Sequence, residues 1–343
     1  MSMPASPPSP RAAAPPAPPP PAPAGGAGLA LLFPGQGAQH PGMGAPWRDT
    51  AHWAVVEDLS EAAGRDLGEL LLHADAERLT RTDNAQLATF TLEMVLLDAL
   101  RSAVGDLAPA VCAGHSLGEY AALTAAGVLT PRDAVRLVAE RGAAMAEAAR
   151  LVPGTMAVLV GPDIARTAAA LVDGRGATGP AEVWVANVNG PGQVVVSGRP
   201  HAVAALTAQA VDAGARALPL RVGGAFHSPL MAAALPRLTR ALAATPLAPG
   251  RCPVVTNADG RAHHGETPAL WRDLLRRQLL DPVRWSDCMT ALHTVTGGRP
   301  RLVELGPGSA LTGLARRLLP PDVPVRSAAT PAQLADVAST VGL

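Results

Sequence analysis

Lysine is absent from this 343-residue sequence, in which all 28 basic residues are arginine. Charged residues make up only 16% of the chain, and the 28 basic residues balance 28 acidic ones. A chain without net charge has neither the basic field of a nucleic-acid-binding protein nor an acidic, solvating tail. Alanine, glycine and proline are abundant instead, which we interpret as the codon bias of a GC-rich genome and not as a sign of function.

Cysteine and long apolar runs are also scarce. The three cysteines, Cys112, Cys252 and Cys288, have no metal-ligand spacing, so we expect reduced core residues in a cytoplasmic protein and no metal site. No stretch of 18 consecutive apolar residues occurs, and we therefore expect no membrane span. The length suffices for a sizeable core, in one large α/β domain or in two domains.

Residues 1–28 differ in composition from the rest, because they hold 11 of the 35 prolines and a single charge, Arg11. No leucine- or valine-rich segment follows that charge, so this stretch does not have the pattern of a secretory signal. Proline at this density neither continues a helix nor pairs within a sheet. We expect a disordered or polyproline II segment.

The order of the apolar patterns predicts an α/β fold with an insertion. Residues 28–33 read as a buried strand that leads into a glycine-rich turn, and residues 52–107 have helical spacing. Residues 154–222 alternate short strand-like runs with helical segments, which indicates a small α+β insertion. From residue 223 onward the helical pattern returns, interrupted by the strand-like runs CPVVTN and RLVELG.

The strand-like run APAVCAG leads directly into the turn Gly114-His115-Ser116-Leu117-Gly118, and a helical run follows. Such a turn, with small residues around the serine, exposes the hydroxyl at the end of a strand and above a helix N-terminus, where an oxyanion is favoured. This pattern predicts a nucleophile elbow with Ser116 as the nucleophile. The alternative is a turn whose serine only caps the helix.

His227 stands out among the nine histidines as a candidate base. It closes the run RVGGAFH and directly precedes Ser228-Pro229, which is typical of a helix start. A loop residue between a strand and a helix can be directed into a cleft and accept a proton there. The alternative is a histidine that merely neighbours a helix cap. His115 adjoins Ser116, but in so sharp a turn its side chain should point away from the hydroxyl.

Arg141 is predicted to lie on an apolar helix face. A helix should begin at Thr130-Pro131 and run to about Arg150, since threonine is a good cap and proline suits the first helical position. The residues that share the face of Arg141 at helical spacing are Ala134, Val138, Met145 and Ala148. A buried guanidinium needs an anionic partner. Two partners remain open, an internal Asp or Glu and a substrate carboxylate.

The glycine-rich turn PGQGAQ contains Gln36 and follows the first strand. It lacks both the Lys-Ser/Thr pair of a P-loop and the spacing of a dinucleotide-binding turn, so we exclude nucleotide binding. A glutamine between two glycines can present its amide or its backbone N–H to an oxyanion.

Seven motifs in order along residues 29–318 resemble those of the malonyl-CoA:acyl carrier protein transacylases. This family includes stand-alone enzymes of fatty-acid synthesis and the acyltransferase domains of polyketide synthases. The motifs are FPGQGAQ, GHSLGEYAAL, AVRLVAERGAAM, ANVNGPGQVVVSG, GAFHSPLM, RQLLDPVRW and ELGPGSALTGL. The resemblance implies an α/β-hydrolase-like catalytic subdomain over residues 29–149 and 223–343, with a ferredoxin-like subdomain inserted at 150–222.

The resemblance also implies roles for individual residues. Ser116 corresponds to the nucleophile and His227 to the general base, which in this family is oriented by a main-chain carbonyl, here that of Gln278. Gln36 and the backbone N–H of Leu117 correspond to the oxyanion hole.

A further set of residues bears on the substrate. The resemblance assigns Arg141 to the malonyl carboxylate, and Leu117 and Phe226 fit the pattern of members that take malonyl. A bulky phenylalanine before the base would crowd an α-methyl branch. Gly224 departs from many polyketide synthase domains, which carry histidine there, and instead fits stand-alone enzymes that serve several synthase modules.

The implied reaction is a ping-pong transfer of malonyl from malonyl-CoA, through a seryl ester, to the phosphopantetheine thiol of an acyl carrier protein. No cofactor or metal is expected, since malonyl-CoA is the substrate and the carrier protein brings the phosphopantetheine. We expect a cytoplasmic monomer whose partners are the carrier protein and malonyl-CoA, with no nucleic acid or membrane. The alternatives are a proofreading acyl-carrier-protein hydrolase of the same fold, whose members tend to lack the arginine, and a non-catalytic docking module.

Overall fold

Two separate sheets organise the computed structural model, which describes residues 28–176 and 182–340. The larger sheet has the strand order β10-β9-β1-β2-β7-β8, and all of its pairs are parallel except β7 with β8. Its central strands are short apolar runs, as expected where both faces of a sheet are covered. The strands are β1 (Gly28–Phe33), β2 (Val111–Gly114), β7 (Val254–Val255), β8 (Ala262–His263), β9 (Pro300–Leu305) and β10 (Val325–Ala328).

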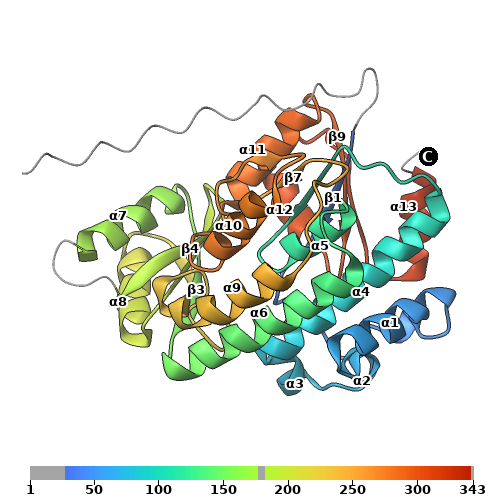
Figure 1. The fold of residues 1–343 in the computed structure, drawn as a ribbon. Helices are drawn as coiled ribbons and strands as arrows, with labels where there is room; N and C mark the ends of the chain where they lie inside the picture. Colours follow the sequence, from blue (N-terminus) through green and yellow to red (C-terminus); the bar gives the residue numbers. More distant parts are fainter. Residues whose placement is uncertain (1–27, 177–181, 341–343) are drawn as a thin grey trace, which may run out of the picture.

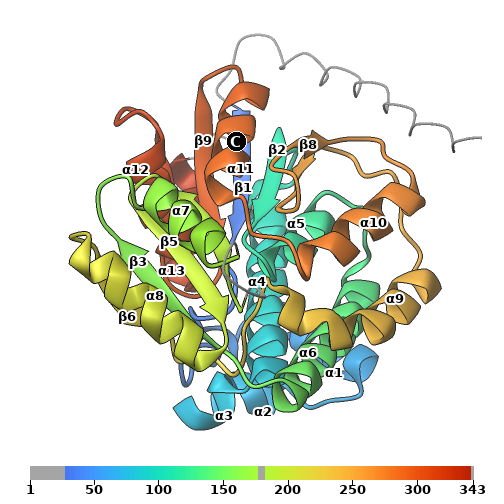
Figure 2. The same cartoon turned by 90° about the vertical axis from the view of Figure 1, so that its left-hand side faces the viewer.

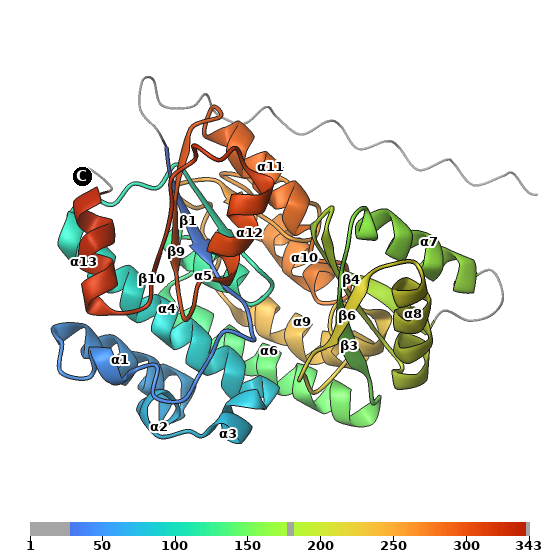
Figure 3. The same cartoon turned by 180° about the vertical axis from the view of Figure 1, so that it is seen from behind.

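The alternation of side chains along β1 explains the two layers of helices. Leu29, Leu31 and Phe33 point into one hydrophobic core, whereas Ala30 and Leu32 point into a second core on the opposite face. The helices of the first core are α1 (Ala54–Ala63), α2 (Leu67–Leu72), α3 (Ala76–Thr80), α4 (Thr82–Val104), α5 (Gly118–Ala125), α6 (Pro131–Leu151), α9 (Leu235–Ala244), α10 (Pro268–Gln278) and α13 (Pro331–Thr340). Those of the second core are α11 (Trp285–Val295) and α12 (Ala310–Leu318), which lie over the opposite face of the sheet (Figure 3).

Three short 3-10 turns precede α-helices, two of them before α1 and one before α9. They are η1 (Ala45–Trp47), η2 (Ala51–Trp53) and η3 (Pro229–Ala234). Among the described helices, none is both long and apolar enough to cross a bilayer.

The second sheet is antiparallel and lies between α6 and η3 in the chain (Figure 1). It has the order β4-β5-β3-β6 and a core of its own against two helices. Figure 2 shows these helices, α7 and α8, side by side across one face of the sheet. The elements are β3 (Thr155–Val160), α7 (Ile164–Gly176), β4 (Val183–Gly190), β5 (Gln193–Gly198), α8 (Pro200–Asp212) and β6 (Arg216–Pro219). This βαββαβ order is the ferredoxin-like arrangement.

Backbone hydrogen bonds tie the small sheet to the large subdomain at one point. The N–H of Val283 donates to the carbonyl of Ala186 (2.8 Å), and the carbonyl of Val283 accepts from the N–H of Val188 (2.9 Å). The strand β4 is irregular at this position, between Val185 and Asn187. The inserted subdomain is therefore joined to its host by an extra pairing as well as by the chain itself.

The predicted fold class is confirmed, with a mostly parallel α/β sheet and a separate antiparallel one. The helix predicted from Thr130 begins at Pro131 and ends at Leu151, and the Thr130 side chain accepts from the N–H of Asp133. The helix α7 and the strands β8 and β10 had not been singled out. The strand predicted over residues 28–33 is β1, with the same limits, and the predicted N-terminal segment before it, residues 1–27, lies outside the described range. The other subdomain limits stay a prediction.

Replacing Gly118 with alanine is expected to lower the free energy of unfolding by about 1–3 kcal/mol, the usual range for overpacking. A Cβ atom there would lie 2.0 Å from the carbonyl oxygen of Phe33, and backbone at the end of β1 cannot move aside as a side chain can. Urea denaturation measures the change.

The matched control is Gly313→Ala in α12, where the nearest atom to a new Cβ is the far end of the Arg317 side chain at 3.7 Å. That variant should gain about 0.5–1 kcal/mol, because alanine restricts the unfolded chain more than glycine does. Equal stabilities of the two variants would contradict this account of the turn.

Candidate active site

Ser116 lies in a strained turn at the carboxyl end of β2. Its φ angle is 53°, a left-handed conformation that residues with a Cβ seldom adopt. The turn is so tight that a Cβ on Gly114 would lie 2.0 Å from the carbonyl carbon of Gly118. Strain of this kind persists only where the surroundings enforce it, and it is common at functional sites.

Two side-chain amides from the last third of the chain hold this turn. The Oδ1 of Asn257 accepts from the backbone N–H of Ser116 (2.6 Å), and the Nε2 of Gln278 donates to the backbone carbonyl of Ser116 (2.8 Å). Asn257 also donates from Nδ2 to the carbonyl of Gly114 (2.8 Å). Both backbone groups of the strained residue are thus bound by side chains that are themselves buried.

His227 faces the Ser116 hydroxyl. Its Nε2 lies 2.7 Å from the Oγ of Ser116, and its Nδ1 lies 2.9 Å from the backbone carbonyl oxygen of Gln278. A carbonyl can only accept, so Nδ1 carries the proton and Nε2 is left as the acceptor for the serine O–H. The cap of η3 is Ser228, whose side chain accepts from the N–H of Leu230, so His227 is free of that role.

The backbone of His227 is left-handed as well, with a φ of 55°. Burial, together with the positive charge of Arg141 and the neighbouring His115, lowers the pKa of His227 to about 3. The imidazole is therefore neutral at ordinary pH, which is the form in which it can accept a proton.

Arg141 points from α6 into the same site, and only 1% of its surface is exposed. Its Nη2 lies 3.1 Å from the Oγ of Ser116 and 3.1 Å from the Oε1 of Gln278, and its Nη1 donates to the Oε1 of Gln86 (2.8 Å). The Tyr120 ring lies 5.5 Å from the guanidinium carbon. The apolar helix face predicted around Arg141 is present, and all its members are buried.

No carboxylate in the described ranges 28–176 and 182–340 forms an ion pair with Arg141, and its Nε has no hydrogen-bond partner there. All the hydrogen-bond partners given above, two glutamines and a serine, are neutral. Burial lowers the pKa of Arg141, and the nearby Tyr120 and Glu119 oppose that shift without forming an ion pair with the guanidinium. Of the two partners left open by the sequence, an internal acid is thus not found at hydrogen-bonding distance.

The remaining predicted residues lie around this cluster. Leu117 is the N-terminal cap residue of α5 and is fully buried, so its backbone N–H belongs to the helix start, where such groups lack intrahelical acceptors. Gln36 is half-buried in the turn after β1, and no hydrogen bond joins its side chain to Ser116 within the described structure. The turn that contains Gln36 packs directly against the turn that contains Ser116, because a Cβ on Gly35 would lie 2.5 Å from the carbonyl oxygen of His115.

Phe226 is buried next to His227 and packs on Gly224. A Cβ at Gly224 would lie 2.6 Å from the Cβ of Ala149 and 3.2 Å from the Cε1 of Phe226. A glycine at this position therefore lets α6 approach the loop that carries the base.

His115 points away from the serine hydroxyl, as predicted. Its Nε2 lies 3.0 Å from the Oδ1 of Asn189 on β4, and its ring lies 5.4 Å from that of Trp285. Burial lowers the pKa of His115, which keeps it neutral. Its role is to connect the turn to the inserted subdomain.

Sequence reasoning missed three polar residues of this site, Asn257, Gln86 and Glu119. Asn257 follows β7, the neighbour of β2, so the shared carboxyl edge of parallel strands was a usable signal. Glu119 lies in the first turn of α5, where the helix dipole alone would favour an acidic residue, yet it is fully buried and its Oε2 accepts from the backbone N–H of Asn257 (2.7 Å). Burial raises its pKa to about 7. Gln86, deep in α4, gave no sequence signal.

No group of three or more His, Cys, Asp or Glu side chains within residues 28–176 and 182–340 is arranged to hold a metal ion. The chemistry available at the site is that of a serine hydroxyl, a neutral imidazole and a buried guanidinium.

Asn257→Ala is expected to slow the labelling of Ser116 by a fluorophosphonate probe roughly tenfold or more, because a loosened nucleophile leaves the productive geometry. The variant should also lose about 1–3 kcal/mol of stability, since it leaves backbone groups unpaired. Active-site labelling and urea denaturation give the two values.

Asn84→Ala is the control, since Asn84 is also buried but bonds to Arg65 and to the carbonyl of Arg78 instead. It should lose comparable stability and keep the labelling rate. If both variants were labelled at the wild-type rate, Asn257 would have no positioning role.

The comparisons with known proteins agree along most of the chain. The family model of the acyl transferase domain matches residues 30–330. The malonyl CoA-acyl carrier protein transacylase of Escherichia coli (strain K12) is 40% identical over 296 residues, which are 85% of this chain and 93% of the relative.

Solved structures give the same result. The crystal structure of MCAT from Mycobacterium tuberculosis has a TM-score of 0.82 and 34% identity, and covers 90% of this chain and 99% of its own. A malonyl-transacylase in complex with its type II PKS acyl-carrier protein has a TM-score of 0.81 and 33% identity, over 92% of this chain and 100% of that one. This chain therefore belongs to the acyl transferase family, among the malonyl CoA-acyl carrier protein transacylases.

Proposed function

We propose that this protein transfers a malonyl group from malonyl-CoA to the phosphopantetheine thiol of an acyl carrier protein, through an ester on Ser116. The observation that carries the proposal is the guanidinium of Arg141, which is buried beside the serine hydroxyl at 3.1 Å with only neutral hydrogen-bond partners. An acyl group that ends in a carboxylate would supply an ion-pair partner in direct contact with the guanidinium. A plain acetyl group would not.

In the first half-reaction, His227 Nε2 takes the proton of Ser116 Oγ as the oxygen attacks the thioester carbonyl. The carbonyl of Gln278 holds the Nδ1–H and stabilises the imidazolium that forms. The tetrahedral intermediate then collapses, the C–S bond breaks, and the imidazolium returns its proton to the departing CoA thiolate. The product is a malonyl ester on Ser116.

The second half-reaction reverses these roles. His227 accepts the proton of the phosphopantetheine thiol, whose sulfur attacks the ester carbonyl, and the serine leaves with that proton. Arg141 holds the same carboxylate through both halves, so the acyl group need not be re-bound. We propose that these side chains carry out the transfer without a cofactor or metal.

Gln36 and the backbone N–H of Leu117 are the proposed oxyanion donors. Leu117 N–H belongs to a helix start, where the dipole adds to the hydrogen bond. Gln36 stands in the adjoining turn, which packs against the Ser116 turn. Loss of one such donor typically lowers the rate roughly 10²–10³-fold.

Selectivity for malonyl over branched acyl groups is proposed to rest on Leu117 and Phe226. The tight packing of Gly224 against Ala149 and Phe226 leaves this ring little room to withdraw from an α-methyl branch.

Two other functions are less well supported. A proofreading hydrolase would not need a buried arginine without an ion-pair partner beside the serine. A docking module would not need Ser116 and His227 to adopt left-handed backbone that brings Oγ and Nε2 within 2.7 Å of each other. We also propose a cytoplasmic location, because the three cysteines are all free thiols.

Arg141→Ala is expected to lose malonyl transfer far more than acetyl transfer, by roughly 10²-fold in the ratio of kcat/KM values, because a charge-assisted bidentate contact is lost only for malonyl. Acyl-CoA panels read by intact-protein mass spectrometry of the carrier protein measure both rates. Ser116→Ala is the blank and should form no acyl ester.

Equal losses for malonyl and acetyl in Arg141→Ala would overturn the carboxylate role, and an ester that persists in Ser116→Ala would overturn the nucleophile.

The pH profile offers a separate test of His227. Because its pKa is lowered to about 3, the base stays neutral down to acidic pH, and the rate of Ser116 labelling by a fluorophosphonate should not fall through the usual histidine range near pH 6.5. Arg141→Gln removes one positive charge that lowers this pKa, so its acid limb should shift to higher pH. A wild-type profile with an apparent pKa near 6.5 would contradict the burial-driven shift.

A further inference from the structure

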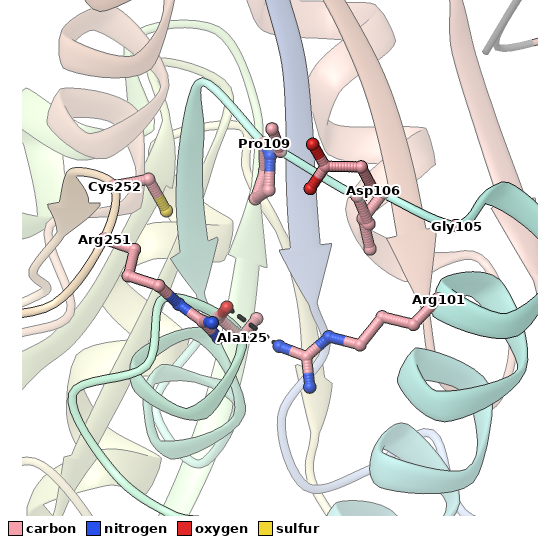
Figure 4. Close-up of a pocket in the computed structure, with 9 residues that line it drawn as sticks. Arg101, Gly105, Asp106, Pro109, Ala125, Arg251 and Cys252 are labelled. Atoms are coloured by element: carbon pink, nitrogen blue, oxygen red, sulfur yellow. Dashed lines mark hydrogen bonds between the residues drawn. The ribbon is translucent and has the colours of Figure 1, made fainter.

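A pocket of about 320 Å³ opens at the amino-terminal edge of the large sheet, at the opposite end of β2 from Ser116 (Figure 4). Arg101 lines it from the last turn of α4, and Arg251 and Cys252 line it from the segment before β7. The loop before β2 closes it with Gly105 and Asp106. None of these residues takes part in the site around Ser116.

The pocket carries an excess of positive charge. Arg101 donates from Nη2 to the carbonyl of Ala125 (3.1 Å), and neither Arg101 nor Arg251 forms an ion pair with a carboxylate in the described ranges. Asp106 is the one acidic residue of the lining, and it pairs with neither arginine there. Burial and the neighbouring Arg251 both lower the pKa of Arg101, as expected for two guanidinium groups that share a small space. An anion bound here would relieve that repulsion.

A pair of thiols forms part of the same wall. The Sγ atoms of Cys252 and Cys112 are 3.8 Å apart. Cys112 is fully buried in β2, whereas Cys252 keeps 8% of its surface exposed and lines the pocket. The third cysteine, Cys288, lies in the other core and contacts Asn257 and the carbonyl of Thr256.

The two thiols are also chemically unequal. The hydrogen bond shared with Cys112 lowers the pKa of Cys252 in spite of its burial, and the charges of Arg251 and Arg101 add to this. The same hydrogen bond and full burial raise the pKa of Cys112. Because Cys252 is also the thiol that lines the pocket, it is assigned as the nucleophile and the fully buried Cys112 as the resolving partner.

We propose that this pocket is a thiol-modification site, at which an anionic low-molecular-weight disulfide binds between Arg101 and Arg251 and oxidises the pair Cys252 and Cys112 to an intramolecular disulfide. The thiolate of Cys252 attacks one sulfur of the small disulfide, forms a mixed disulfide and releases the first small thiolate. Cys112 loses its proton and attacks Cys252 Sγ, which releases the second small thiolate. Two protein thiols are oxidised and one small disulfide is reduced to two thiols.

The geometry requires a modest movement. A disulfide bond is about 2.05 Å long, so the two sulfurs must approach from 3.8 Å. Cys112 is fixed within β2, where its N–H donates to the carbonyl of Pro253 (2.9 Å). Cys252 precedes β7 and lies outside any strand, so it is the residue that moves. The bridge would join the strand that leads to Ser116 with the segment that leads to Asn257.

The test compares two disulfides of opposite charge on the fully reduced protein. Oxidised glutathione is anionic and cystamine is cationic, and both are followed by intact mass and by peptide mapping under non-reducing conditions. The expected result is a Cys112–Cys252 bridge that forms about tenfold faster with oxidised glutathione, since a pocket of one charge sign raises the local concentration of the opposite sign by roughly this factor or more.

Variants separate the steps. Cys112→Ser should accumulate a mixed disulfide on Cys252, Cys252→Ser should abolish the reaction, and Cys288→Ser should react as the wild type does. Arg101→Gln combined with Arg251→Gln should bring the ratio of the two rates to about one, as the charge that selects the anion is gone. Circular dichroism confirms that each variant is folded.

Peptide mapping of the wild type decides the proposal even if a cysteine variant fails to fold. Absence of the Cys112–Cys252 bridge would overturn it, as would modification of Cys288 first, or equal rates with the two disulfides. None of these readouts depends on acyl transfer, so the proposed function stands or falls separately.

Discussion

Three contacts of Gln278 hold the site together. Its backbone carbonyl accepts from His227, its Nε2 donates to the carbonyl of Ser116, and its Oε1 accepts from Arg141. One residue at the end of α10 thus sets the tautomer of the base, fixes the strained turn of the nucleophile and satisfies part of the buried guanidinium. The nucleophile, the base and the arginine come from different elements, and among residues 28–176 and 182–340 Gln278 alone bonds to all three, through its backbone carbonyl and its side-chain amide. A change in the position of α10 would therefore disturb orientation, strain and charge at once.

The sequence predicted those parts of the molecule that depend on local patterns. The strand before Ser116, the capped helix that carries Arg141 and the compact insertion all follow from spacing and turn residues, and they are present. What it did not reveal depends on contacts between distant residues. The amide of Asn257 meets Ser116 across 141 positions, and only the pairing of β7 with β2, which the sequence does not give directly, brings the two together. Gln278 was expected to contribute a carbonyl, while its side-chain bonds depend on how α10 packs.

The site combines several unfavourable states that the surrounding cores must offset. Left-handed backbone at Ser116 and His227 typically costs about 1–3 kcal/mol for each residue. The guanidinium of Arg141 is removed from water without an ion-pair partner in the described ranges, which raises the free energy of the folded state further. These costs are confined to one edge of the large sheet, where the strands end, and two hydrophobic cores cover both faces behind it. At that edge the strained turn presents the serine hydroxyl, and the guanidinium beside it can bind the carboxylate of an acyl group.

The order of these residues along the chain has a consequence for synthesis. Ser116 leaves the ribosome early, but Asn257 and Gln278, which shape its turn and orient its base, belong to the last third of the chain. A nascent chain that ends before them holds a serine with no enforced conformation and no oriented imidazole. Such a chain does not yet have the geometry that acyl transfer requires. Because of this long sequence separation, the site is complete only when the polypeptide is nearly complete.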